Sequence, residues 1–239
     1  MLYNCPLKRF YVKSTLGKDI EITGQEHIHL SQVLRAQIGE NVIFCCGDEF
    51  DYEYEILKIA KNSTLLKFIK STPNVHNPKA CLAVYMAAIK PDNLNLVVQK
   101  LNEIGVRKLV IFDSERSNVS VQNLRLDRLE SIAEQSCKQC MRSIPLKVEC
   151  GKLDCLSGYN KVFFANECDN RKHLGEIITG VDENIALIIG PEGGFTEEER
   201  GKILANKNVI SVSLGVRIFR AETAAIAAAS IILSKMGEI

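Results

Sequence analysis

The chain lacks an excess of charge of either sign. It has 30 lysines and arginines against 29 aspartates and glutamates, which gives a formal net charge of +1. Such a balance creates no overall field that would draw the whole protein onto a polyanion such as nucleic acid. Any polyanion site must therefore be local and formed by a few basic side chains.

Long apolar runs are also absent. The sequence has no stretch of about 18 apolar residues, the length typical of a membrane-spanning helix, and its start, MLYNCPLKRF, has no continuous apolar core. Neither export nor membrane spanning is indicated, and we expect a cytoplasmic protein. The composition, 46% hydrophobic and 25% charged, is that of an ordinary globular protein.

The nine cysteines are odd in number and do not follow the spacing of a secreted disulfide framework. Reduced thiols in a cytosol are the simpler interpretation. Cys137 and Cys140 form a C-x-x-C pair, but no second pair and no nearby histidine completes a four-ligand zinc set. We therefore expect no metal.

The first part of the chain alternates between short strand-like stretches and turns. Between Arg9 and Phe68 these stretches are RFYV, NVIFCC, FDYEYEI and TLLKFI. They predict a small barrel or sandwich, with one short helix in QEHIHLSQVLR. The segment STPNVHNPK contains two prolines and disfavours regular structure. We place a boundary there and predict domains at 1–72 and 78–239.

Beyond this boundary, apolar strands alternate with amphipathic helices. The expected strands are ACLAVYMAAI, KLVIF, KVFFA, NIALIIG and NVISVSLG, and the expected helices cover 93–104, 126–139, 171–178, the TEEERGKI segment and 222–235. This order predicts an α/β domain with a largely parallel sheet. The continuous apolar runs IALII and KLVIF predict helices on both faces of that sheet.

The first chemical motif is IGPEGGFTEEE, from Ile189 to Glu199, in which a buried strand breaks into a glycine turn and then a helix. Thr196 is the expected N-cap, and the acidic residues of the first turn face the helix dipole. Glycines let backbone amides approach a ligand closely, although such a turn is also an ordinary tight connection. The motif is neither a phosphate loop, because no Lys-Ser or Lys-Thr follows, nor the G-x-G-x-x-G dinucleotide fingerprint.

The second motif is LGVRIFRAETAA, from Leu214 to Ala225, another strand exit with a glycine. Arg217 and Arg220 stand in the loop before a helix, where a guanidinium can bind phosphate or stabilise an electron-rich base. The alternative is structural, with Glu222 placed favourably at the helix start and paired there with Arg220.

Together the two motifs resemble the paired signature of the SPOUT class of knotted methyltransferases, and specifically the ribosomal RNA small subunit methyltransferase E family. KRFYV, HIHLSQVLR, GDEFDYEYEI, VVQKLNEIGV, FDSERS and QCMRSIP are similar to that family in the same order, which is more specific than any single motif. The chain departs from the family at Phe219 and Ala221, where Leu and Thr are frequent, and is one residue short between Arg142 and Pro145.

The resemblance implies a PUA-like N-terminal β-barrel, a C-terminal α/β domain with a trefoil knot, and a homodimer. It implies S-adenosylmethionine-dependent methylation of N3 of one uridine in the 16S ribosomal RNA of the small subunit. The residues that it assigns to the cofactor lie at three strand ends: Leu187, Ile188, Gly190, Glu192, Gly193, Leu214, Gly215, Ile218 and Phe219, with Asn166 and Glu167 at the pocket edge.

Catalysis and RNA binding are expected to depend on arginines. We expect Arg220 to stabilise the uridine anion or a flanking phosphate, with Glu222 orienting it. The expected RNA contacts are made by five further arginines, two of them on the barrel: Arg9, Arg35, Arg116, Arg142 and Arg217.

Three other functions compete with this one. A sister enzyme of the same fold could act on transfer RNA, or the chain could be a non-catalytic RNA-binding module, although its intact glycines at 190, 193, 194 and 215 argue against decay. A metal-dependent hydrolase would need a clustered set of histidines and carboxylates, which the sequence lacks.

Overall fold

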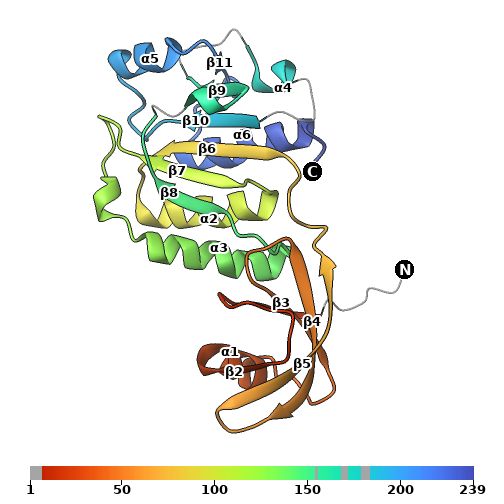
Figure 1. Cartoon of the computed structure of the whole chain (residues 1–239). Helices are drawn as coiled ribbons and strands as arrows, with labels where there is room; N and C mark the ends of the chain where they lie inside the picture. Colours follow the sequence, from red (N-terminus) through yellow and green to blue (C-terminus); the bar gives the residue numbers. More distant parts are fainter. Residues whose placement is uncertain (1–6, 154–155, 168–171, 179–183) are drawn as a thin grey trace. The chain divides into compact units, whose positions relative to one another are not determined.

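The computed structural model describes residues 7–153, 156–167, 172–178 and 184–239. The chain divides into two compact units, both drawn in Figure 1. The first comprises Met1–Asn77 and Cys137–Ile144, and the second comprises Pro78–Ser136 and Pro145–Ile239. The prolines of STPNVHNPK indicated a boundary near residue 77, but no sequence pattern indicated that residues 137–144 belong to the first unit.

The first unit contains a five-stranded sheet in the order β1-β3-β4-β5-β2. β1 pairs with β3 in parallel, and the other neighbours are antiparallel. Alternate residues of a strand, such as Val42 and Phe44 of β3 or Tyr54 and Ile56 of β4, are fully buried, as the period of two in a strand requires. The strands are β1 (Lys8–Tyr11), β2 (Ile20–Thr23), β3 (Asn41–Cys45), β4 (Phe50–Ile59) and β5 (Ser63–Pro73).

The four strands predicted for this unit are confirmed, and two details differ. The predicted helix is α1 (Gly24–Ile28), which continues into one π-helical turn, η1 (His29–Val33). β5 runs on to Pro73, which pairs with Phe50, so the prediction that STP disfavours a strand was wrong. A proline is tolerated there because it lies at the end of the strand, where one missing N–H costs little.

The second unit contains a six-stranded sheet in the order β11-β9-β10-β6-β7-β8 (Figure 1). All neighbouring strands are parallel, which confirms the predicted α/β architecture with a parallel sheet. The strands are β6 (Cys81–Ala87), β7 (Lys108–Phe112), β8 (Lys147–Cys150), β9 (Lys161–Ala165), β10 (Asn184–Ile189) and β11 (Val209–Val212). Of these, only β8 was not predicted.

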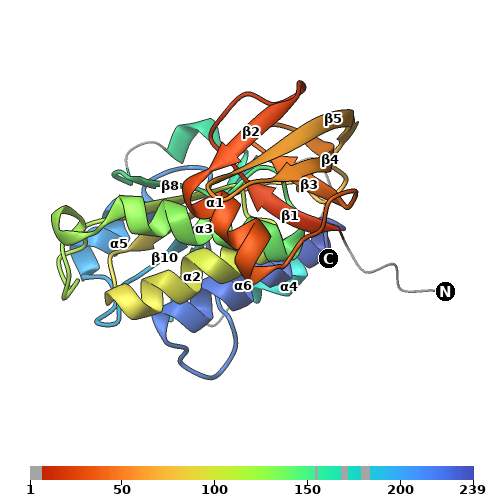
Figure 2. The same ribbon diagram turned by 90° about the horizontal axis from the view of Figure 1, so that it is seen from below.

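Helices cover both faces of this sheet. α2 (Pro91–Ile104), α3 (Leu126–Cys140) and α6 (Ala221–Lys235) contribute to the core on the face that carries Leu187, and α2 lies beside α6 (Figure 2). α5 (Glu197–Leu204) packs with Ile188 on the opposite face. The remaining short elements are η2 (Val121–Asn123), η3 (Leu156–Gly158) and α4 (Leu174–Ile177).

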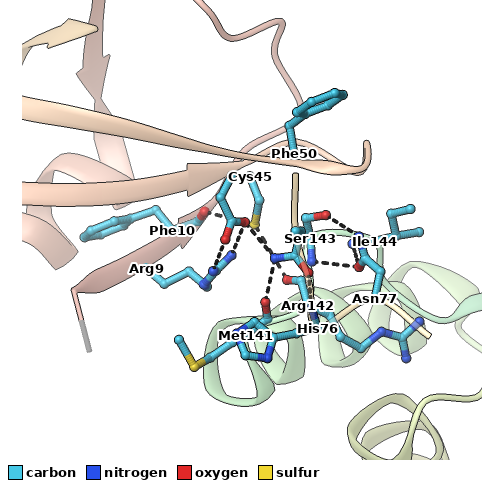
Figure 3. A network of polar contacts seen from close by, with 12 residues as sticks. Arg9, Phe10, Cys45, Phe50, His76, Asn77, Met141, Arg142, Ser143 and Ile144 are labelled. Atoms are coloured by element: carbon cyan, nitrogen blue, oxygen red, sulfur yellow. Dashed lines mark hydrogen bonds and ion pairs between the residues drawn. The ribbon is translucent and has the colours of Figure 1, made fainter. Parts of the chain in front are cut away.

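Side-chain hydrogen bonds attach residues 141–144 to the first unit (Figure 3). The Asn74 Nδ2 atom donates to the Met141 carbonyl oxygen at 2.9 Å. The Asn77 Oδ1 atom accepts from the backbone nitrogens of Ser143 and Ile144, both at 3.1 Å. The side-chain amides of Asn74 and Asn77 thus supply hydrogen bonds to backbone groups that have no partner in a helix or strand. These bonds explain why residues 141–144 belong to the first unit.

Candidate functional site

Three strands of the second unit end level at the carboxyl edge of its sheet. Ile188 of β10 pairs with Phe164 of β9, and Val212 of β11 pairs with Ala165 of β9. When the β10–β9 register is continued by two residues, Gly190 lies opposite Asn166. When the β11–β9 register is continued by one residue, Ser213 lies opposite Asn166 on its other side. Because neighbouring strands are about 4.8 Å apart, the two glycine-bearing exits leave the sheet roughly 10 Å from each other. Binding sites of open α/β sheets occur at this edge.

The glycine turn after β10 requires residues without a side chain. Gly194 has a φ of +68°, a left-handed conformation, and a Cβ atom on it would lie 2.8 Å from Oε1 of Glu167. A Cβ on Gly193 would lie 3.1 Å from Cβ and 3.2 Å from the carbonyl oxygen of Arg116. The turn is therefore enclosed by residues that follow β7 and β9, and close packing accounts for the glycines.

We expect Gly194→Ala and Gly201→Ala to change stability in opposite directions. Alanine at 194 costs about 1–2 kcal/mol for the left-handed backbone, plus the approach to Glu167. Gly201 lies inside α5 with no atom within 4 Å of an added Cβ, and alanine there is expected to add about 1 kcal/mol. Urea unfolding midpoints of the two variants measure this, and a shift of the same sign in both would contradict it.

The second exit, after β11, is exposed and open. Gly215 has a φ of +112°, with no atom within 4 Å of an added Cβ, and its backbone nitrogen donates to the Ser213 hydroxyl oxygen at 3.1 Å. Ile218 is 89% exposed and Phe219 is half-buried. The loop is therefore open to solvent at Gly215 and Ile218.

The two predicted catalytic residues stand at the start of α6. Arg220 is the N-cap residue, and its side chain is exposed. Glu222 is buried, and its Oε2 atom has no hydrogen-bond partner among the described residues. No hydrogen bond or ion pair joins the side chains of Arg220 and Glu222, two residues that the structure describes, so the orientation of Arg220 by Glu222 stays a prediction. A buried carboxylate oxygen that lacks a partner marks a place where a ligand could supply a donor.

The other predicted cofactor residues lie at the same edge. The side chains of Leu187 and Ile188 are fully buried on opposite faces of the sheet, and both residues pair with β6 and β9. Their backbone contact with the cofactor stays a prediction. Asn166 is buried and donates from Nδ2 to the Ser211 hydroxyl oxygen at 3.1 Å. Leu214 is half-buried and Glu192 is exposed.

The five arginines expected to bind RNA fall into two groups. Arg35, Arg116 and Arg217 are exposed. Arg9 is only 9% exposed and Arg142 only 2%. Arg9 makes two hydrogen bonds to Asp51, of 2.7 and 2.6 Å. Burial leaves neither guanidinium a surface for a phosphate, so we now favour structural roles for Arg9 and Arg142 over the predicted RNA contact.

The contact between the start of α5 and the loop that follows β7 was only partly predictable from the sequence. Thr196 is the N-cap of α5, as predicted, and Glu199 completes a capping box with it. Glu199 also binds Ser114 and Glu115, which follow β7. The T-x-x-E pattern was enough to suggest the capping box, but no sequence signal pointed to Ser114 as a second partner.

The described residues contain neither a group of metal-ligating side chains nor a membrane-spanning helix. Across residues 7–153, 156–167, 172–178 and 184–239, no group of histidine, cysteine and carboxylate residues is arranged to hold a metal ion. Cys137 and Cys140 are not joined in a disulfide. Burial raises the pKa of the Cys45 thiol to about 11. Within the same described ranges, no helix has the length and apolar character needed to cross a bilayer.

Comparisons with known proteins agree with this geometry. The model of the RNA methyltransferase domain family matches residues 76–233. The ribosomal RNA small subunit methyltransferase E of Helicobacter pylori strain J99 is 31% identical over 231 residues, which cover 92% of this chain and 98% of that protein. The protein of the same description from Rickettsia conorii is 29% identical over 238 residues, with 95% and 94% covered.

Solved structures share the fold along the whole chain. A ribosomal RNA small subunit methyltransferase E from Neisseria gonorrhoeae, bound to S-adenosyl methionine, has a TM-score of 0.83 at 24% identity and covers 96% of this chain and 98% of its own. A probable rRNA-methyltransferase from Porphyromonas gingivalis has a TM-score of 0.85 at 22% identity, with 97% and 99% covered. With a family model over more than half of its length and a relative above 30% identity, the chain belongs to the ribosomal RNA small subunit methyltransferase E family of RNA methyltransferases.

Proposed function

We propose that the protein transfers a methyl group from S-adenosylmethionine to N3 of a uridine in the 16S ribosomal RNA of the small subunit. The proposal depends on one observation: the glycine-bearing loops that follow β10 and β11 leave the sheet at the same edge, in a chain of this family. Relatives that match almost the whole chain are described as ribosomal RNA small subunit methyltransferases.

The residues at this edge suit the cofactor. When bound, S-adenosylmethionine supplies a methyl group activated by attachment to a sulfonium. Gly215 has open space around it, so the backbone there is accessible, whereas the ring of Phe195 packs against Gly190, where a Cβ atom would lie 2.9 Å from it. The buried Oε2 atom of Glu222 can accept a hydrogen bond from a ligand amine or amide. Two neighbours of the same fold were solved with this cofactor.

Arg220 is proposed to act on the uracil. N3 of uridine carries a proton that must leave before the nitrogen can attack a methyl group. A cation held beside the ring carbonyls stabilises the resulting anion and so lowers the cost of deprotonation. The guanidinium of Arg220 is exposed at the start of α6, three residues after Arg217, and is free to take this position. Alignment of N3 with the methyl group also contributes to the rate.

Exposed arginines are proposed to bind the RNA backbone. Arg116 and Arg217 stand in loops of the carboxyl edge, and Arg35 is exposed on the first unit. Arginine matches the geometry of phosphate oxygens. Such contacts position the RNA without reading its sequence.

For Arg35, we expect the alanine variant to bind ribosomal RNA more weakly, with the slope of log K against log salt reduced by about 0.7–0.9, the value for one lost phosphate contact. The matched control is Gln37→Ala, which changes an exposed and uncharged neighbour and should leave the slope unchanged. Equilibrium titrations at several salt concentrations measure both. Equal slopes for the wild type and Arg35→Ala would remove Arg35 from the RNA surface.

The finer features of fold and assembly belong to the same proposal. We infer that the first unit is a PUA-like RNA-binding barrel, that the backbone of the second is knotted, that the enzyme is a homodimer, and that it works in the cytoplasm. Supporting the knot, α6 follows the edge strand β11 yet packs on α2, β6 and β10. The chain therefore returns to the middle of the sheet after leaving its edge.

One experiment tests the reaction, the substrate and the atom together. Labelled S-adenosylmethionine is incubated with the protein and unmodified small subunits, and the modified nucleoside is mapped. We expect 3-methyluridine at a single position of 16S RNA. Label in transfer RNA in place of ribosomal RNA would favour a sister activity, and RNA binding without cofactor binding would favour a non-catalytic module.

A further inference from the structure

The carboxylate of Glu199 makes more contacts than helix capping requires. Its Oε2 atom accepts a hydrogen bond from the backbone nitrogen of Thr196 at 2.9 Å, and the Thr196 Oγ1 atom accepts from the backbone nitrogen of Glu199 at 3.2 Å. These two bonds complete the capping box. The other carboxylate oxygen, Oε1, accepts from the Ser114 hydroxyl at 2.7 Å and from the backbone nitrogen of Glu115 at 3.0 Å. Glu199 therefore joins the start of α5 to the loop that follows β7.

This loop carries Arg116 to the glycine turn. The Ser114 carbonyl oxygen accepts from the backbone nitrogen of Ser117 at 3.0 Å, which closes a tight turn around residues 115 and 116. The Arg116 Nη1 atom donates to the Gly193 carbonyl oxygen at 3.3 Å. Since the turn is held at its first two residues by Glu199, the carboxylate determines where the side chain of Arg116 begins.

We propose that Glu199 is a positioning residue for RNA binding, whose ionised carboxylate fixes the 114–117 loop and so holds Arg116 beside the glycine turn. The inference rests on the proposed function, in which Arg116 contacts RNA. Burial alone would raise the pKa of Glu199, but the hydrogen bonds from Thr196, Glu115 and Ser114 outweigh it and lower this pKa below its usual value. The carboxylate is therefore charged at neutral pH and able to accept at both oxygens.

The first test separates the two oxygens of Glu199. Ser114→Ala removes a donor to Oε1 and leaves the capping box intact, so we expect the KM for RNA to rise about tenfold, the loss of one charge-assisted hydrogen bond. The kcat and the dissociation constant for S-adenosylmethionine should stay near the wild-type values. Glu199→Gln keeps only one acceptor oxygen, so it should raise the same KM.

A matched control lies one residue away. Glu198 occupies the same helical turn, is exposed, and pairs with Lys202 on the helix surface at 2.6 Å. Glu198→Gln makes the same chemical change without touching the loop, and we expect its KM for RNA to equal that of the wild type. If Glu198→Gln raised the KM as much as Glu199→Gln, the effect would come from the helix as a whole and the inference would fail.

A double-mutant cycle tests the route through Arg116. If Glu199 and Ser114 act by holding Arg116, Ser114→Ala should have no further effect in an Arg116→Ala background. Additive losses would indicate a merely structural contribution and overturn the inference. A wild type that transfers no methyl group would defeat the proposed function alone, because equilibrium RNA binding by the same variants still decides whether Glu199 positions Arg116.

Discussion

An Arg220→Ala variant is expected to lose about 10²- to 10³-fold in kcat on small-subunit RNA, the range measured when one preorganised donor to a developing anion is removed. The side chain is exposed at the start of α6, so the loss should come without a change in the free energy of unfolding. The backbone carbonyl of residue 220 keeps its bond from Ala224, at 2.8 Å.

Arg217→Ala is the control for this effect. Arg217 is an exposed arginine of the same loop, and its proposed contact is with phosphate, so its loss should raise the KM for RNA and spare kcat. Single-turnover methylation with saturating cofactor separates the two quantities. Full turnover by Arg220→Ala would refute its assignment and leave Arg220 as a structural N-cap.

Arg9→Ala is expected to destabilise the first unit by about 3–5 kcal/mol, the cost of leaving a buried charge without its partner. The side chains of Arg9 and Asp51 are only 6% and 15% exposed. Asp51 also accepts from Asn74 at 2.8 Å, and the same Asn74 amide group holds the Met141 carbonyl. The loss should therefore spread from the sheet to residues 141–144 (Figure 3).

Two comparisons distinguish a structural Arg9 from one that binds phosphate. Replacing both partners with apolar residues, as in Arg9→Met with Asp51→Leu, should recover most of the stability. The salt dependence of RNA binding should be the same for this double variant and the wild type. Denaturant unfolding and RNA titration measure the two effects. Unchanged stability in Arg9→Ala together with a weaker salt dependence would return Arg9 to the RNA surface.

Much of the fold could be predicted because its signals are local. Apolar runs such as KLVIF and IALII lie on consecutive residues, and each became a buried strand of the parallel sheet. β2 and β8 were not predicted, because their sequences, IEIT and KVEC, contain no continuous apolar run. The place of residues 141–144 in the first unit depends on amide groups of Asn74 and Asn77, more than 60 residues earlier in the chain, which no local pattern encodes.

The site shows the same division. Its glycine turns could be located from sequence because glycine beside a strand end has a direct conformational meaning. The burial of Arg9 could not, because arginines are mostly exposed and its partner Asp51 is 42 residues away. Similarly, the T-x-x-E spacing distinguishes Glu199 from the two glutamates before it as a capping residue, but only the path of the 114–117 loop shows that it also binds Ser114 and Glu115.

Because β9, β10 and β11 end level, the width of the proposed pocket is set by main-chain pairing. Inter-strand spacing is the same for any sequence that forms the sheet, so mutations can change the lining of the pocket while its span stays constant. The fold is accordingly retained at 22–24% sequence identity, where two solved structures have TM-scores of 0.83 and 0.85 to this chain. Affinity for the methyl donor would then change through substitutions in the loops, while the strands keep the distance between the two sides of the pocket constant.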